Sequence, residues 1–257
     1  MVGQNNPFWK HFHQLRLGAV TTMTASEILK KLAKLGSPGI KKTLMRHGAK
    51  EPLFGVKIED LKKIQKTIKT DHALALELYD TGNSDAMYLA GLIADPSRMT
   101  RENLQGWVEK ASWAMISEYT VAGVAAESPY GFELAMKWID SARDSTAASG
   151  WFILGNLARL KPDAELPLKE YRGLLARVGK EIHKSPNEVR YAMNNFMIAC
   201  GGGIVSLTDE AMATAQKIGK VTVDMGDTAC KVPDAGTYIE NVRKMGRLGK
   251  KRGSARC

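Results

Sequence analysis

The sequence predicts an all-α protein, a right-handed α-solenoid in which antiparallel helix pairs stack side by side. Three observations predict this fold. From Thr24 onward, apolar residues recur three and four positions apart, which is the spacing of a helix with one buried face. Short segments rich in glycine, proline and serine separate these stretches, and such residues end helices or form turns. The alternation typical of a β-strand occurs only in VTVDM, residues 221–225.

The first predicted helix begins at Thr24, because Thr24-Ala-Ser-Glu27 is a capping box, and it ends at Gly36-Ser37-Pro38. A second, shorter helix covers residues 39–47 and is closed by Gly48. A lysine-rich third helix follows Pro52. Further helices are predicted over 71–80, 83–94, 101–110, 113–126, 129–142, 146–160, 167–183, 187–200, 208–219 and 234–246. Ser185-Pro186-Asn187-Glu188 is a second capping box, with proline at the first helical position.

Consecutive helices joined by short turns pack antiparallel, and pairing them gives units of roughly 35–45 residues, the period of HEAT and armadillo arrays. No fixed consensus recurs, so an irregular helical bundle is the alternative. We expect a repeat domain over 23–220, a loop and helix packed on it over 221–242, and a flexible basic tail over 243–257. Residues 1–22 have no acidic residue and no clear period, which is typical of a disordered lead, a mis-assigned start or a weak transit segment.

The positive charge of the chain is concentrated near its two ends. The net charge is +10 overall, but it is +9 over residues 30–69, +7 over 243–256 and −6 over 70–160. Such segregation predicts contact with a polyanion such as nucleic acid. The alternative is that the lysines only form solvated helix faces and that the basic tail is disordered.

Other features exclude some classes of protein. No apolar run approaches the roughly 20 residues that span a bilayer, so we expect no membrane partner. The chain has three cysteines, an odd number without CxxC spacing: Cys200, Cys230 and Cys257. This predicts that the protein lacks a disulfide framework and works in a reducing compartment, the cytoplasm. We expect a monomer without a cofactor.

The segment 113–126 is the first candidate site. It is almost entirely apolar or small, but Trp113, Ser117, Glu118 and Thr120 interrupt it. At 100° per residue, Trp113, Ser117 and Thr120 share one stripe and Glu118 lies a quarter-turn away. A carboxylate inside such a helix is either a rim residue paired with a Lys or Arg, or a binding or catalytic group.

Two other segments are candidates. In the helix at 187–200, Arg190, Asn194 and Asn195 could bind phosphates or base edges, or could form a buried, satisfied polar network. The loop at 219–236 carries Asp224, Asp227 and Cys230, which suggest a metal or a reactive thiol; turn and capping roles for the aspartates are the alternative.

Two segments resemble the AlkD-like DNA alkylation repair family of HEAT-like repeat proteins: FGVKIEDLKKIQK at 54–66 and NSDAMYLAGLIADPSRMTRENLQGWVEKASW at 83–113. The likeness covers roughly residues 24–200. It implies a basic concave face that holds double-stranded DNA, including alkylated DNA, and base-excision activity on N-alkylated purines. The residues expected to contact DNA are Lys41, Lys42, Arg46, Lys57, Lys62, Lys63, Lys66, Arg190, Asn194, Asn195, Lys250, Lys251 and Arg252.

The family's active helix reads Trp-Asp-x-x-Asp, and here only the tryptophan is kept, as Trp113. Ala114 and Ser117 take the places of the two aspartates, and Glu118 follows one residue later. The family's phosphate-binding arginine has no match in 148–154, and its late tryptophan is replaced by Asn194 or Asn195. Because a carboxylate stabilises an oxocarbenium-like sugar or activates water, our hypothesis is that glycosylase activity in this chain depends on Glu118.

The function thus has three candidate classes. The chain is an alkylpurine DNA glycosylase with Trp113, Ser117 and Glu118 at its catalytic site, a non-catalytic protein that binds bent or branched DNA, or a HEAT-type scaffold that binds proteins.

Overall fold

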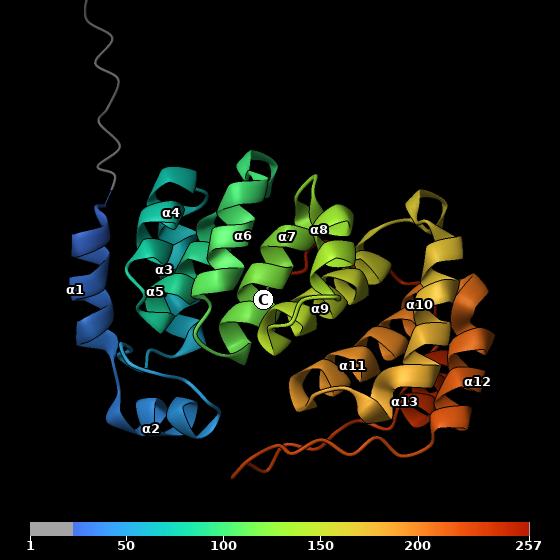
Figure 1. Ribbon diagram of the computed structural model, residues 1–257. Helices are drawn as coiled ribbons and strands as arrows, with labels where there is room; N and C mark the ends of the chain where they lie inside the picture. The colour runs from blue at the N-terminus through green and yellow to red at the C-terminus, as the bar shows by residue number, and fades with distance from the viewer. Residues whose placement is uncertain (1–22, 257) are drawn as a thin grey trace, which may run out of the picture.

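The computed structural model describes residues 23–256 (Figure 1). The predicted lead at 1–22 and Cys257 lie outside the described residues. The described part is all-α, which confirms the predicted fold class. Its α-helices are α1 (Ala25–Leu35), α2 (Pro38–Arg46), α3 (Ile58–Ile68), α4 (His72–Asp80), α5 (Ser84–Ile93), α6 (Arg101–Lys110), α7 (Ala122–Glu127), α8 (Gly131–Trp138), α9 (Asp144–Leu160), α10 (Leu168–Glu181), α11 (Asn187–Gly203), α12 (Thr208–Ile218) and α13 (Ala235–Lys244).

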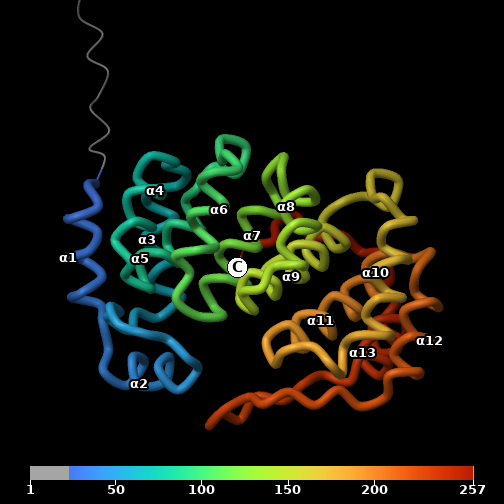
Figure 2. The backbone as a smooth tube through the Cα atoms, in the orientation of Figure 1, coloured from blue at the N-terminus to red at the C-terminus, as the bar shows by residue number. Residues whose placement is uncertain are grey.

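The helices form a curved array with an inner and an outer row, as the backbone trace shows (Figure 2). The inner row consists of α5, α7 with the π-helix that precedes it (Met115–Val121), α9 and α11, each packed on the next. The outer helices α4, α8 and α10 pack against them. Inner helices are buried around most of their circumference, whereas α10 buries only the stripe Tyr171, Leu174, Leu175 and Val178. This difference is expected when one row has neighbours on several sides.

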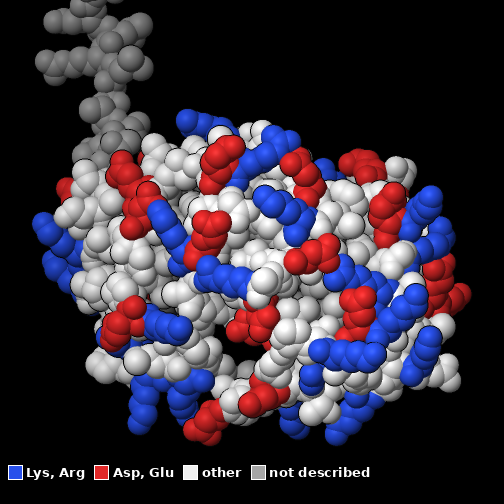
Figure 3. All heavy atoms as spheres, viewed as in Figure 1, with Lys and Arg blue, Asp and Glu red and all other residues white. Residues whose placement is uncertain are grey.

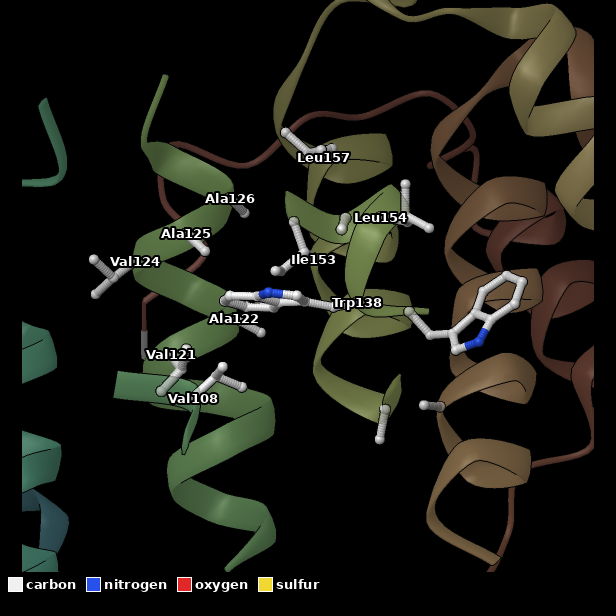
Figure 4. Close-up of a cluster of buried hydrophobic side chains, with 14 of the residues drawn as sticks. Val108, Val121, Ala122, Val124, Ala125, Ala126, Trp138, Ile153, Leu154 and Leu157 are labelled. Carbon is white, nitrogen blue, oxygen red and sulfur yellow. The ribbon is translucent and has the colours of Figure 1, made fainter. Parts of the chain in front are cut away.

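The middle of the core lies between α7, α8 and α9 (Figure 4). Trp138, only 1% exposed, inserts its indole among Ala122 and Ile153, and its Nε1 donates to Gln105 Oε1 at 2.9 Å. A buried indole needs such a partner for its N–H. This packing fixes α9 against α7, and therefore fixes the relative position of the two inner helices that carry the site.

The capping box at Thr24 is confirmed, because the Thr24 hydroxyl accepts from the Glu27 amide and the Glu27 carboxylate accepts from Thr24. The one at Ser185 is wrong. Ser185 Oγ donates instead to Glu181 O, so it satisfies the end of the preceding helix rather than the start of α11. Residues 221–225 are not a strand, since no strand lies beside them among the described residues.

The loop before α3 is organised by a buried carboxylate. Asp85, 3% exposed in the first turn of α5, accepts from the amides of Phe54 (2.6 Å), Gly55 (3.1 Å) and Val56 (2.9 Å). Gly55 has φ +78°, and a Cβ there would lie 2.5 Å from Lys41 N. This contact connects the N-terminal basic segment to the inner row.

We expect Asp85→Ala to lower the free energy of unfolding by about 3 kcal/mol, because it leaves three amides, two of them in buried residues, without their charged acceptor. Chemical denaturation measures the change. Asp71→Ala is the matched control, since Asp71 only caps α4 through the Leu74 amide and should cost about 1 kcal/mol. Equal effects of the two substitutions would contradict a special role for Asp85.

The chain that follows α13 runs back across the array, and we call residues 249–256 the C-terminal strap. Gly249 N donates to Gly202 O near the end of α11, and Arg252 N donates to Arg159 O at the end of α9. Figure 1 shows this red segment returning to the middle of the molecule. The strap therefore passes over the C-terminal ends of the inner helices.

Its cationic side chains meet the carbonyl groups at those helix ends. Lys251 Nζ donates to Ala158 O, Gly203 O and the Asp163 carboxylate, at 2.9, 2.6 and 2.7 Å. A positive charge is favourable there, because the C-terminal end of a helix carries a partial negative charge and unsatisfied carbonyls.

Arg256 repeats this arrangement at the other end of the strap. Its guanidinium donates to Glu127 at 2.8 Å and to the carbonyls of Gly91 and Ala94 near the end of α5. These contacts place residues 249–256 against the array, and the flexibility predicted for 243–257 stays a prediction. The basic residues hold the strap to the array through contacts with segments more than 40 residues away.

No single helix among the described residues is long and apolar enough to cross a membrane, and α11 with α12 meets that criterion only as a pair bent by 119°.

Candidate nucleic-acid interface

The segment predicted as the active helix contains a π-helix, Met115–Val121. A π-helix has more residues per turn than an α-helix, so the angular spacing of 100° per residue does not apply through it. The consequence is that Trp113, Ser117 and Glu118 do not form one site. They face three different environments.

Ser117 faces its own helix. It is 1% exposed, and its hydroxyl donates to Ala114 O at 3.3 Å and to Trp113 O at 3.4 Å. Its carbonyl accepts from Ser149 Oγ at 3.0 Å, which joins the π-helix to α9. Ser117 therefore fastens two inner helices together.

Trp113 lines a cavity of about 410 Å³, and the other residues that line it include Lys50, Arg143, Asp144 and Glu188. The indole is half-buried, and its Nε1 is buried without a hydrogen-bond partner in residues 23–256. Charges of both signs surround it, so this cavity is not a purely cationic phosphate site.

Glu118 lies in a second cavity, of about 260 Å³. We call it the Glu118 cavity; its remaining lining residues are Tyr119, Trp151, Phe152, Gly155, Asn156, Arg159, Asn195, Phe196, Ala199, Arg252 and Ala255. Glu118 is 5% exposed. Burial, together with the charge of Glu188, raises the pKa of Glu118 to about 8, so the carboxyl is mainly protonated at pH 7. The rim ion pair that the sequence left open is absent among the described residues.

The remaining groups of the Glu118 cavity come from α9, α11 and the strap. Phe152 lies between Tyr119 and Tyr191, with ring centroids 5.8 and 6.3 Å away. Arg159 and Arg252 stand together, and both burial and the neighbouring Arg252 lower the pKa of Arg159. Sequence reasoning missed Phe152, Asn156 and Arg159, because they lie on a helix whose matching arginine was sought several residues earlier.

Of the three polar residues predicted in α11, only Asn195 reaches the Glu118 cavity; its Nδ2 also donates to Tyr191 O. Arg190 donates to Thr222 O and Ser185 O. Asn194, 1% exposed, donates to Pro233 O. Both side chains therefore hold the loop between α12 and α13, and their contact with DNA stays a prediction.

Asn187 completes this arrangement, and sequence reasoning did not single it out. Its side-chain Nδ2 donates to Asp224 O, and its side-chain Oδ1 accepts from Asp224 N, both at 2.8 Å. Asn187, Arg190 and Asn194 share one face of α11, three and four residues apart. That polar spacing is the signal that could have identified them as a loop anchor.

The predicted basic residues of α2 and α3 lie mostly at the surface. On α2, Lys42 and Arg46 line a shallow groove of about 530 Å³ with Lys41, which pairs with Glu51. Lys57 at the N-cap of α3 and Lys62, Lys63 and Lys66 within it are exposed, and Lys63 pairs with Asp60. Figure 3 shows Lys and Arg side chains over α2, with an opening between it and the C-terminal half.

The three basic residues predicted in the C-terminal segment have different environments. Lys250 is exposed, Arg252 is exposed at the Glu118 cavity, and Lys251 is engaged with helix carbonyls and Asp163. Lys251 therefore supports the fold instead of offering a free charge.

Cys230 is exposed in the loop between α12 and α13, and Asp224 accepts from the Gly226 amide as a turn residue. Within residues 23–256, no group of three or more His, Cys, Asp or Glu side chains is arranged to hold a metal ion.

These features define a class: a HEAT-like helical array with a polar, aromatic and cationic cavity on its inner row. A family model described as "DNA alkylation repair enzyme" matches residues 28–223, and the chain belongs to this family.

Three similar proteins agree with this placement. "Uncharacterized protein Lin0241" of Listeria innocua and "Uncharacterized protein Lmo0209" of Listeria monocytogenes are each 34% identical over 227 residues, covering 86% of this chain and 98% of theirs. A solved structure is similar with a TM-score of 0.85 and 35% identity, covering 91% of this chain and all of the other. It is described as "a new family of proteins related to the HEAT-like repeat DNA glycosylases with affinity for branched DNA structures".

Proposed function

We propose that this protein binds DNA with a preference for branched structures and that it does so without cleaving a glycosidic bond. The observation that carries the proposal is the likeness, over 91% of the chain, to a protein described as having affinity for branched DNA. The charge distribution supports it, since exposed basic residues are concentrated on α2 and α3 and a further exposed arginine lies on the strap.

The chemistry of the inner row supports a non-catalytic role. Ala114 and Ser117 stand where the family's active helix carries acids, and Ser117 is occupied by backbone carbonyls. Glu118 is mainly neutral at pH 7, and a neutral carboxyl does not provide the negative charge that stabilises a cationic sugar.

An alkylpurine DNA glycosylase is the second candidate. It is favoured by the family description and by Trp113, which lines a cavity and whose indole N–H has no hydrogen-bond partner within residues 23–256. A base-release assay on methylated DNA separates the two. If the wild type releases 7-methylguanine or 3-methyladenine and Glu118→Gln does not, the protein is a glycosylase and our proposal is wrong. We expect no release above the protein-free rate.

Fluorescence anisotropy with a four-way junction and a duplex of equal length tests the binding proposal. We expect tighter binding to the junction and a Kd that rises steeply with salt, because each neutralised phosphate releases counterions. Equal, salt-independent affinity for both DNAs would support the protein scaffold instead.

The basic face of α2 gives a specific prediction. Replacing Lys41, Lys42 and Arg46 together by alanine should reduce the slope of log Kd against log salt by about 2 to 3, since each phosphate contact contributes roughly 0.9. The matched control replaces three exposed lysines, Lys169, Lys180 and Lys184, which lie on or just after α10. An equal loss of slope in both variants would mean that α2 acts only through net charge.

A further inference from the structure

We propose that the Glu118 cavity is a binding site for one unpaired nucleotide, with its base stacked against the outer face of the aromatic side chains and its phosphate at Arg159 and Arg252. This inference rests on the proposed function, because a branch point interrupts the continuous duplex and is a place where a nucleotide can be left unpaired. It identifies a recognition element that duplex DNA alone would not fill.

The walls of the cavity suit a base. The ring centroids of Phe152 and Tyr119 are 5.8 Å apart, and the two ring planes meet at 45°. Because Tyr119 is 45% exposed, part of this aromatic surface is open to solvent. Single-stranded nucleic acids bind to such surfaces by stacking, because every base has a π-face. The cavity volume of about 260 Å³ lies just below the range typical of drug-sized ligands, which fits one ring system and not a base pair.

The inner end of the cavity has polar side chains that form no ion pair with any of residues 23–256. Glu118 is nine-tenths buried and faces the cavity, together with the side-chain amides of Asn156 and Asn195. A protonated carboxyl presents one donor and one acceptor side by side, which matches the edges of adenine, cytosine and thymine. A buried polar group of this kind is costly unless a ligand or water satisfies it.

The outer end is cationic. Arg252 reaches the cavity because the strap binds Arg159 O through its own backbone amide at 2.8 Å. Burial, and then repulsion by the guanidinium of Arg252, lowers the pKa of Arg159, and in residues 23–256 no carboxylate forms an ion pair with either arginine. A phosphate between them relieves this repulsion and accepts their hydrogen bonds.

The test uses the full chain and dye-labelled junctions that differ at one place. One junction carries two unpaired thymidines at the branch, and the other carries two abasic nucleotides there. We expect the wild type to bind the first roughly 5- to 150-fold more tightly, the range that one stacked base gives. Equal affinity for both junctions would overturn the proposal.

Two variants separate the parts of the site. Phe152→Leu keeps an apolar side chain but removes the stacking face, so it should weaken binding to the thymidine junction and not to the abasic one. Arg252→Ala should weaken both, because the phosphates remain. Phe132→Leu, whose ring packs on Tyr171 outside the cavity, is the matched control for Phe152→Leu and should bind both junctions as the wild type does. Lys250→Ala removes a neighbouring exposed charge that does not line the cavity, so it should weaken binding less than Arg252→Ala. A uniform effect of Phe152→Leu on both junctions would also overturn the proposal.

A single-stranded oligothymidine and its abasic analogue distinguish failure of this site from failure of branched-DNA preference. If junction and duplex bind equally but oligothymidine binding depends on Phe152, the nucleotide site stands and the preference fails. If the junction is preferred but Phe152→Leu has no base-dependent effect on either DNA, the preference stands and the nucleotide site fails.

Discussion

Deletion of residues 249–257 is expected to lower the free energy of unfolding by about 4 kcal/mol. The deletion removes the ammonium that satisfies Ala158 O and Gly203 O, and leaves Asp163 and Glu127 without their cations. Each charge-assisted hydrogen bond to a partly buried acceptor contributes about 1–3 kcal/mol, reduced here because the lysine and arginine side chains are about one-fifth exposed. Thermal unfolding followed by circular dichroism should show a Tm lower by about 10 °C.

Two point variants localise that effect. Lys251→Met and Arg256→Met keep an apolar side chain of similar length but remove the cation, and each should account for a large part of the loss. Lys250→Ala, at an exposed neighbour, should leave Tm unchanged within about 1 °C. A strap deletion that moves Tm no more than Lys250→Ala would show that the strap adds nothing to the fold.

The strap also illustrates what the sequence could not reveal. Lys251 and Arg256 have the composition of a phosphate-binding tail, and only the fold brings them to helix carbonyls as many as 165 positions earlier in the chain. Charge composition identifies a cation but not its partner. The same limit applies to Arg190, whose guanidinium donates to a loop carbonyl that the sequence did not indicate.

Helices, in contrast, were predictable because their signals are local. The capping box at Thr24 and the apolar spacing after it are contained within one or two turns, and α6 begins and ends where its pattern does. The Ser185 box failed because its hydroxyl had a competing carbonyl one turn earlier, at Glu181.

The candidate site was predicted in part. The sequence indicated that Glu118 lies off the stripe of Trp113, and the two side chains do line different cavities. It could not indicate the π-helix, because the wider turn is stabilised by packing against α5 and α9 and leaves no local pattern. Nor could it join Phe152 and Arg159 to Glu118, since only tertiary packing places these helices side by side.

The buried Glu118 gives the stability of the protein an unusual pH dependence. Its pKa rises from 4.5 to about 8 in the folded chain, so between these values the folded state keeps a proton that the unfolded state releases. The unfolded state therefore binds fewer protons, and stability falls by about 1.4 kcal/mol per pH unit until the pH passes about 8. By pH 7 about 3 kcal/mol is lost relative to pH 4.5. Glu188 and Tyr191 of α11, Arg159 of α9 and Arg252 of the strap are the titratable and charged groups around it.

Glu118→Gln is expected to remove this loss, because glutamine has nearly the shape of the protonated carboxyl but does not titrate. The variant and the wild type should be equally stable near pH 4.5, and the variant should be more stable by about 3 kcal/mol at pH 7. Urea unfolding at pH 5, 6, 7 and 8 measures the difference, with Glu77→Gln on the exposed face of α4 as the control for losing one negative charge. Parallel pH profiles for Glu118→Gln and the wild type would mean that Glu118 is ionised in the folded protein, and a charged carboxylate would then be present in the cavity after all.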